Sequence, residues 1–216
     1  MLGSPYGAQR ASRRFRIRPA AGLLLTVVML GSIVAAPSVA ATSSGTVRIA
    51  STATLSTTTV DRPWISAEAF YLGLVNCTRT GGWVQRDGTC WGYNSGRYSG
   101  YVRPLIWSLG ISDGVSRPYA RLLAVTGQCS HYLDHDPGYR LRRAGYVHWT
   151  WGENIGCRDA YVSVKSAVLA SHLAFQAEKY NGGGHWRNIK NSAYLYIGIG
   201  IWRYGYRTRL VTDFYR

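Results

Sequence analysis

The sequence WTWGENIGC, residues 149–157, places a single carboxylate, Glu153, among tryptophans, an isoleucine and two glycines. Apolar and aromatic neighbours of this kind indicate a partly buried side chain. A buried carboxylate needs a cation, a metal ion or hydrogen-bond donors to remain ionised. The partner of Glu153 therefore has to come from another part of the chain.

The first 40 residues have the features of an export signal. Five arginines between positions 10 and 18 precede an apolar run at 20–36, and the small residues Ser-Val-Ala follow at 38–40. We expect signal peptidase to remove residues 1–40. An uncleaved anchor is the alternative, because the apolar run is longer than a usual signal core, although it is short for a membrane span. The motif SRRF at 12–15 is similar to a twin-arginine signal, but its phenylalanine comes one position early, so ordinary secretion is favoured.

The exported part of the chain is strongly basic. Without residues 1–40 it keeps 20 of the 25 basic residues and all 10 acidic residues, which leaves a formal charge of +10. The charge is spread over the chain, which is compatible with a solvated surface or with attraction to an anionic cell-wall polymer, a membrane surface or nucleic acid. Because no nucleic-acid-binding motif is present, we favour an anionic extracellular surface over DNA or RNA.

All four cysteines, Cys77, Cys90, Cys129 and Cys157, lie in the exported part. An even number of cysteines in an oxidising compartment predicts two disulfides, for which three pairings are possible. We favour Cys77 with Cys90, which closes a short loop, and Cys129 with Cys157. A four-cysteine zinc site is disfavoured because the sequence has no Cys-x-x-Cys spacing.

Residues 41–63, rich in serine, threonine and alanine, indicate a flexible spacer, so the folded domain is expected at 64–216.

Helices are predicted in three places within that domain. The first helix is predicted from Ser66 to the glycines at 81–82, and the second from near Ser116 to Gly127. The third is predicted at about 160–180, capped by Asp159 and ended by glycines that leave His185 on a loop.

The remaining chain predicts strands and one long loop. Residues 146–151 have the composition of a strand followed by a turn at GENIG, and 195–202 with 208–214 predict an antiparallel hairpin. Gly198 and Gly200 are expected to allow close packing of a helix on that hairpin. Residues 81–103 are expected to be a loop that serves either as a binding surface or as crosslinked cover for the core. Together these elements predict an α+β fold with helix, sheet and helix layers.

The order of the motifs resembles the CAP superfamily, or SCP-like extracellular domain, of cysteine-rich secretory proteins, antigen 5 and pathogenesis-related proteins, particularly its bacterial members. The resemblance covers about residues 66–215. It is carried by LVNCTR at 74–79, a histidine after the second helix, GENI at 152–155, GHWRNI at 184–189, IGIGIW at 197–202 and LVTDF at 210–214.

The resemblance implies a three-layer α-β-α sandwich with a small antiparallel sheet and a cleft that holds two histidines and two acids. The matching positions are His131, Glu153, Glu178 and His185, where Glu178 follows Phe175 by three residues. This donor set suits zinc or another divalent metal ion. An acid–base pair and a purely structural hydrogen-bonded lock are the alternatives. A Cys129–Cys157 disulfide would hold the segment of His131 to that of Glu153.

Other histidines and acids have plainer interpretations. Asp134, His135 and Asp136 are expected in a polar loop ending at Pro137 and Gly138. We expect His172 to be a hydrogen-bonded core residue. His148 is expected to lie on one face of a strand.

The sequence predicts a secreted CAP-domain protein that acts at or near the cell envelope, mainly by binding, with no stable membrane span after signal cleavage. The resemblance also implies lipid or sterol as a ligand class, without residues to assign to it. One alternative is a metal-assisted hydrolase that uses the four cleft residues. Another is an adhesin for anionic envelope polymer that uses an aromatic loop, Trp83, Trp91, Tyr93, Tyr98 and Tyr101.

Overall fold

The computed structural model describes residues 61–216. The expected signal peptide and nearly all of the expected spacer lie outside the described residues. The first helix begins at Ile65, next to the boundary expected for the domain. Within the described part of the chain, no helix is both long enough and apolar enough to cross a membrane.

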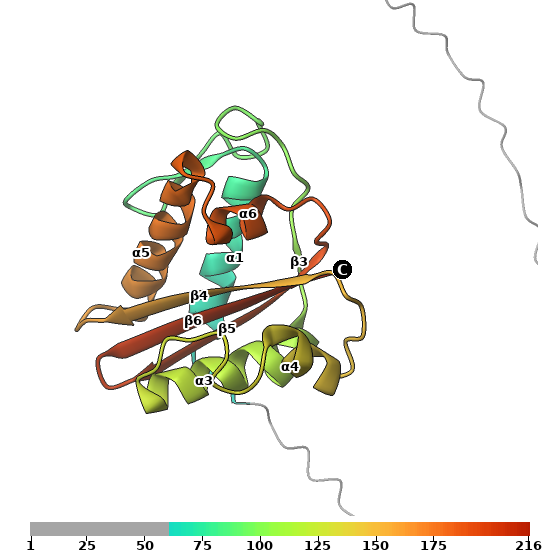
Figure 1. Cartoon of the computed structure of the whole chain (residues 1–216). Helices are drawn as coiled ribbons and strands as arrows, with labels where there is room; N and C mark the ends of the chain where they lie inside the picture. The colour runs from blue at the N-terminus through green and yellow to red at the C-terminus, as the bar shows by residue number, and fades with distance from the viewer. Residues whose placement is uncertain (1–60) are drawn as a thin grey trace, which may run out of the picture. The chain divides into compact units, whose positions relative to one another are not determined.

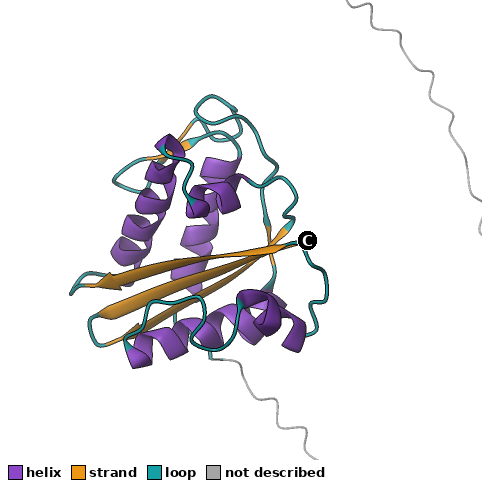
Figure 2. Ribbon diagram, in the orientation of Figure 1, coloured by secondary structure: helices purple, strands orange, loops and turns teal. Residues whose placement is uncertain are grey.

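A four-stranded sheet lies between two layers of helices (Figure 1, Figure 2). The strand order is β3 (Ile106–Trp107), β5 (Tyr196–Tyr204), β6 (Arg207–Tyr215) and β4 (Trp151–Asp159), and only the β3–β5 pair is parallel. One face packs against α1 (Ile65–Arg79) and α5 (Val164–Ala177), and the other against α3 (Arg117–Thr126) and α4 (Pro137–Arg143). The predicted α+β sandwich is confirmed.

The predicted hairpin is also confirmed, and its alternating sequence serves both faces of the sheet. In β5 the three isoleucines at 197, 199 and 201 are buried against the layer of α1 and α5. On the opposite face a Cβ atom at Gly200 would overlap the backbone of Ser116, and one at Gly198 would overlap the side chain of Ile111. The two glycines therefore let a helical segment approach the sheet closely, as expected from the sequence.

That helical segment begins earlier than predicted. It runs through α2 (Leu109–Ile111), the π-helix η1 (Ser112–Ser116) and α3, and it ends at Gly127 in the left-handed conformation, with φ of 77°. Ser108 caps its start by accepting a hydrogen bond from the Ile111 N–H. The start was missed because Gly110 and Gly114 weaken the helical pattern of the sequence.

Along much of the outer edge of β5, side-chain oxygens take the place of a neighbouring strand and accept hydrogen bonds from its backbone N–H groups. β3 pairs with only the first two residues of β5. Beyond it, the Ile199 N–H donates to Ser112 Oγ over 2.8 Å, and the Ile201 N–H donates to Glu68 Oε1 over 3.3 Å. Glu68 is itself buried and forms an ion pair with Arg117.

The predicted strand at 146–151 and the turn at GENIG are wrong. Residues 146–150 have no regular secondary structure, and GENIG lies inside β4, which pairs with β6 from Trp151↔Tyr215 to Asp159↔Arg207. Pairing along the whole of β6 extends the strand through both glycines. The hydrogen-bonded pairing of β4 with β6 therefore outweighs the local preference of these glycines for a turn.

Two helix boundaries also differ from the prediction. α5 starts at Val164 with Ser163 as its cap, whereas Asp159 ends β4 and pairs with Arg209. The helix continues as a 3-10 turn, η2 (Glu178–Tyr180), and the chain then forms α6 (Gly184–Lys190). His185 therefore lies on a short helix and not on the predicted loop.

Helix α4 differs from the prediction, which ends a polar loop at Pro137 and Gly138. Asp136 caps this helix by accepting from the Tyr139 N–H over 2.9 Å, and Pro137 occupies the first turn. An Asp-Pro pair at this position is a common helix start, so the signal was present in the sequence.

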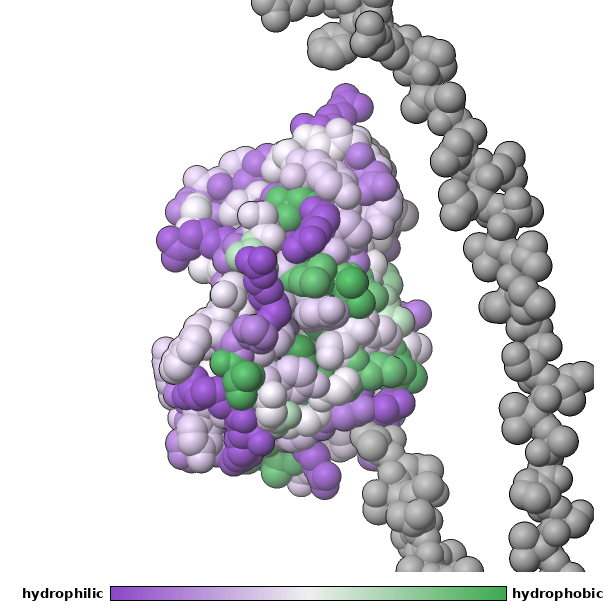
Figure 3. All heavy atoms as spheres, turned by 90° about the vertical axis from the view of Figure 1, so that its right-hand side faces the viewer, coloured by the Kyte–Doolittle hydropathy of each residue, from purple (hydrophilic) through white to green (hydrophobic). Residues whose placement is uncertain are grey.

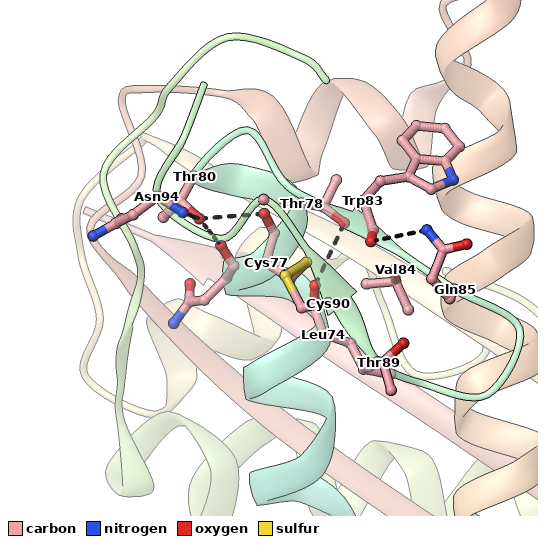
Figure 4. Close-up of a disulfide and its surroundings, with 12 residues drawn as sticks. Leu74, Cys77, Thr78, Thr80, Trp83, Val84, Gln85, Thr89, Cys90 and Asn94 are labelled. Atoms are coloured by element: carbon pink, nitrogen blue, oxygen red, sulfur yellow. Dashed lines mark hydrogen bonds between the residues drawn. A yellow bond between two sulfur atoms is a disulfide. The ribbon is translucent and has the colours of Figure 1, made fainter. Parts of the chain in front are cut away.

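Both disulfides have the favoured pairing, Cys77–Cys90 and Cys129–Cys157. Figure 4 shows the first, which joins the end of α1 to the small hairpin of β1 (Trp83–Val84) and β2 (Cys90–Trp91). The second joins the segment that precedes His131 to β4. It therefore holds together the two segments that carry the first half of the expected cleft.

Candidate functional site

Glu153 lies on β4 with its side chain almost completely buried, only 1% exposed. Its Oε1 atom lies 2.7 Å from His131 Nδ1, and its Oε2 atom forms an ion pair with Arg140 Nη2. A buried carboxylate is stable as an anion when a guanidinium and a second donor satisfy it. Arg140 is thus the cation that the sequence WTWGENIGC requires.

Arg140 also organises the loop that carries His131. Its Nη1 atom donates to the carbonyl oxygens of His131 and His135, over 2.9 Å and 2.7 Å. Its guanidinium lies 3.5 Å from the centre of the Tyr119 ring, a cation–π contact with α3. From the sequence Arg140 is only one of the dispersed basic residues, because α4, which carries it inward, is not predicted.

A second buried acid lies beside Glu153. Asp213 on β6 is paired in register with Glu153 and accepts a hydrogen bond from Ser116 Oγ over 2.7 Å. Burial, together with the negative charge of Glu153, raises the pKa of Asp213 to about 8. Asp213 therefore keeps its proton at neutral pH, and the buried cluster contains one carboxylate charge opposite one arginine charge.

Glu178 and His185 form a second pair, on η2 and α6. His185 Nδ1 lies 2.6 Å from Glu178 Oε1, and Glu178 Oε2 accepts from the backbone N–H groups of His185 and Trp186. Partial burial acts to raise the pKa of Glu178, but the hydrogen bond and charge of His185, together with the two backbone N–H groups, outweigh it and lower that pKa. The His185 ring stacks on Phe175, with ring centres 4.3 Å apart.

Two asparagines connect the strand of the first pair to the helix of the second. Asn154 Nδ2 donates to the carbonyl oxygen of His185 over 3.1 Å. Asn188 Nδ2 donates to the Glu153 carbonyl oxygen over 3.1 Å and to Asn154 Oδ1 over 2.8 Å. The backbone positions of the two pairs are therefore fixed relative to each other.

A cleft of about 600 Å³ opens beside the first pair. Its walls are His131, Tyr132, Asp136, Pro137, Trp151, Gly152, Glu153 and Asn188. Glu178 and His185 do not belong to this lining. The structure thus arranges the four expected site residues as two histidine–carboxylate pairs, of which the first contacts the cleft.

The donor atoms of these pairs bear on the expected metal site. Among residues 61–216, no group of three or more histidine, cysteine, aspartate or glutamate side chains is placed to hold a metal ion. Both oxygens of Glu153 and of Glu178 are engaged by protein donors. Carboxylates bound in this way commonly orient a histidine whose other nitrogen is the ligand. Metal binding by His131, Glu153, Glu178 and His185 stays a prediction, in which the two carboxylates would orient the imidazoles.

The other polar candidates have structural partners. Asp134 lies 3.0 Å from His135 and 3.4 Å from Arg143, as expected for a polar loop. His172 is fully buried with its Nε2 atom 2.9 Å from Thr78 Oγ1, and burial lowers the pKa of His172 to about 3. The prediction of a hydrogen-bonded core histidine is confirmed.

The expectation for His148 is wrong, because its segment forms no strand. The residue is exposed. Its backbone N–H donates to the Tyr215 hydroxyl over 2.8 Å, and its ring lies edge-on to the Tyr215 ring.

The aromatic residues proposed for an adhesin lie on and after the β1–β2 hairpin. Trp91, Tyr93 and Tyr101 are more than half exposed, whereas Trp83 and Tyr98 are half-buried. Trp83 and Tyr180 line a groove of about 390 Å³ between this hairpin and the end of α5. Polymer binding by the loop stays a prediction.

No family model and no curated protein matches the sequence. Among solved structures, an extracellular protein containing an SCP domain from Bacillus anthracis is similar, with a TM-score of 0.50 and 19% identity over 70% of this chain. The match covers 41% of that protein, so this chain spans about two fifths of its length. Ancylostoma-secreted protein Ac-ASP-7 (TM-score 0.40, 18% identity, 73% of this chain and 70% of that one) is a weaker likeness. Another is NaASP2 with Zn²⁺ (TM-score 0.46, 14% identity, 68% of this chain and 78% of that one).

Proposed function

Because the chain has the fold of an SCP-like, or CAP, domain, we propose that it is a secreted protein that binds a ligand of the cell envelope in the cleft beside His131 and Glu153. One observation carries the proposal. Glu153 is held by Arg140 and His131, while His131, 39% exposed, faces a cleft of about 600 Å³. A cleft of this size with a few fixed polar groups is typical of a binding site.

The state of Glu153 favours binding over hydrolysis. A general base must reach the proton that it removes, and its carboxylate must be free to accept it. Both oxygens of Glu153 already accept from protein donors, and one of these donors is a permanent cation. Glu153 therefore acts as a positioning residue for the His131 imidazole, and the metal-assisted hydrolase is the less supported alternative.

Secretion is supported by three features of the chain. The arginine-rich start and the apolar run that follows it have the pattern of an export signal. Both disulfides join segments of the folded domain, and such bonds persist in oxidising compartments. The formal charge of +10 on residues 41–216 favours an anionic partner.

The test of the cleft uses purified cell-wall fragments that carry teichoic acid and measures sedimentation of the protein with them. We expect His131→Ala and Tyr132→Ala each to weaken retention at least about fivefold, the effect of losing one good contact. His135→Ala is the matched control, because His135 is an exposed histidine outside the cleft lining. Equal retention of all three variants would contradict the proposal.

Metal binding is tested separately by calorimetric titration of Zn²⁺ alone into the wild type. If the imidazoles hold the ion, His131→Ala and His185→Ala lower its uptake and His135→Ala does not. Absence of uptake by the wild type would remove the metal from the proposal and leave ligand binding to the wall-fragment experiment.

A further inference from the structure

The segment between α4 and β4 has large apolar side chains that are exposed to solvent. Trp149 is 80% exposed and Val147 is 66% exposed. Two hydrogen bonds hold the backbone of this segment in place. The Tyr146 N–H donates to the Leu141 carbonyl oxygen over 3.0 Å, and the His148 N–H donates to the Tyr215 hydroxyl. Trp149 and Val147 are therefore exposed on a segment whose backbone is hydrogen-bonded to the folded domain.

The outer face of α4 continues this surface. Arg140 and Leu141 point into the protein, whereas Tyr139, Arg142 and Arg143 are exposed. The Arg142 guanidinium lies 5.2 Å from the Trp149 ring centre, and that of Arg143 lies 6.0 Å from the Tyr139 ring centre. Aromatic rings and guanidinium groups are thus paired along the surface.

The surface reaches α2 through Tyr146, whose hydroxyl lies against Gly110, next to the exposed Leu109. We call the whole set the Trp149 patch: Leu109, Tyr139, Arg142, Arg143, Val147 and Trp149. Figure 3 views the molecule from the side of β3 and α4 and shows apolar surface interspersed with strongly hydrophilic side chains. The described structure places no other part of the chain over Trp149 or Val147.

The patch carries positive charge that is available to a partner. Asp134 lies 3.4 Å from Arg143 and 3.0 Å from His135. Arg142 has no carboxylate partner among residues 61–216, and its contact is the Trp149 ring. An anion that approaches Trp149 therefore meets an uncompensated guanidinium beside it.

We propose that the Trp149 patch docks the protein on an anionic phospholipid surface. The occupant must supply both an anion for Arg142 and an apolar phase for Trp149, Val147 and Leu109. Phospholipid headgroups and the acyl chains beneath them supply both, and tryptophan and arginine are favoured at that boundary. A sugar–phosphate polymer supplies only the anion. The inference deepens the proposed function, since it rests on the protein acting at the cell envelope, and it assigns the contact to residues outside the cleft.

The experiment measures partitioning of the whole exported chain onto phosphatidylcholine vesicles with and without phosphatidylglycerol. We expect binding only to the vesicles with phosphatidylglycerol. Trp149→Ala should weaken it about tenfold, because an interfacial tryptophan anchors the apolar side of such a contact. Arg142→Gln should weaken it about fivefold. The tryptophan fluorescence of the wild type should shift to shorter wavelength on binding, and that of Trp149→Ala should shift less.

Trp91→Ala is the matched control, because Trp91 is a 59% exposed tryptophan on the β1–β2 hairpin. It should bind vesicles as the wild type does, and all variants should melt at the wild-type temperature because the altered side chains are exposed. Absence of wild-type binding, or an equal loss in Trp91→Ala, would overturn the inference. So would a result in which Trp149→Ala loses retention on immobilised polyglycerol phosphate but not on vesicles. His131→Ala should bind vesicles normally, so failure of the patch and failure of the cleft are distinguishable.

Discussion

The two histidine–carboxylate pairs have the same chemistry in different settings. His131 and Glu153 come from a loop and a strand, and the Glu153 side chain is 1% exposed beside Arg140. His185 and Glu178 are seven residues apart, and their side chains are 31% and 25% exposed. Glu178 needs no arginine, because the backbone N–H groups at the start of α6 supply its remaining hydrogen bonds.

This difference shows how burial changes what a carboxylate requires. A partly exposed carboxylate is still solvated by water, so local donors are sufficient for it. A buried one must be matched by a cation, which here is brought in by a separate helix. The first pair is therefore tied to the tertiary fold, whereas the second is mainly a local feature of the η2–α6 segment.

The largest effect is expected from Arg140→Met. It leaves the Glu153 charge buried without its cation, which should lower the free energy of unfolding by about 3 to 5 kcal/mol. Urea denaturation measures the change. The control Arg142→Met, on the exposed face of the same helix, should change it by less than about 0.5 kcal/mol. A loss below about 1 kcal/mol in Arg140→Met would remove the distinction between the pairs.

The second effect concerns the disulfide that joins the segments of the first pair. Replacing Cys129 and Cys157 together by serine should lower the free energy of unfolding by about 2 to 4 kcal/mol. The same replacement of Cys77 and Cys90 should cost about 0.7 kcal/mol less, because the sequence separation is 13 and not 28 residues. Urea midpoints of both double variants test the order, and a larger loss for the Cys77–Cys90 pair would contradict it.

A third prediction uses the buried acid beside the first pair. The pKa of Asp213 is raised from 3.8 to about 8 by burial and by Glu153, so its contribution to stability is complete below pH 4 and is lost as the pH rises through 8. The loss has a slope of about 1.4 kcal/mol per pH unit. We therefore expect the free energy of unfolding of Asp213→Asn to depend less on pH than that of the wild type between pH 5 and 8. Parallel curves would show that Asp213 titrates normally.

The smallest effect is expected from Glu178→Gln. An exposed pair contributes little, so the free energy of unfolding should fall by less than about 1 kcal/mol. The glutamine keeps an oxygen that can accept from the His185 N–H, which reduces the loss further. Thermal melting measures the change. A loss as large as that of Arg140→Met would mean that the second pair is as dependent on its charge as the first.

Much of the architecture could be predicted from local patterns. The hairpin of β5 and β6 follows from alternating isoleucines around a glycine turn, and Gly198 and Gly200 correctly indicated a close helix. Errors arose where the pairing of a distant segment decides the structure. GENIG has the composition of a turn, but the ladder with β6 makes it a strand.

The candidate site was predicted in part for the same reason. The residues His131, Glu153, Glu178 and His185 could be named from motifs aligned with a family pattern, but their division into two separate pairs was not predicted. Arg140 has no such motif, and its inward position depends on α4, whose Asp136-Pro137 start was not recognised. Asp213 became a neighbour of Glu153 only through the register of β6 against β4, which a single sequence does not specify.

The side chains along the outer edge of β5 also bear on whether the protein can pair with copies of itself. An open strand edge offers a row of N–H groups to which a strand of another molecule can add, and this is a common route to aggregation. Ser112 and Glu68 occupy two of those groups in β5. Both groups are buried beneath the helices, so alanine at either position would leave a buried N–H of β5 without an acceptor and lower the free energy of unfolding.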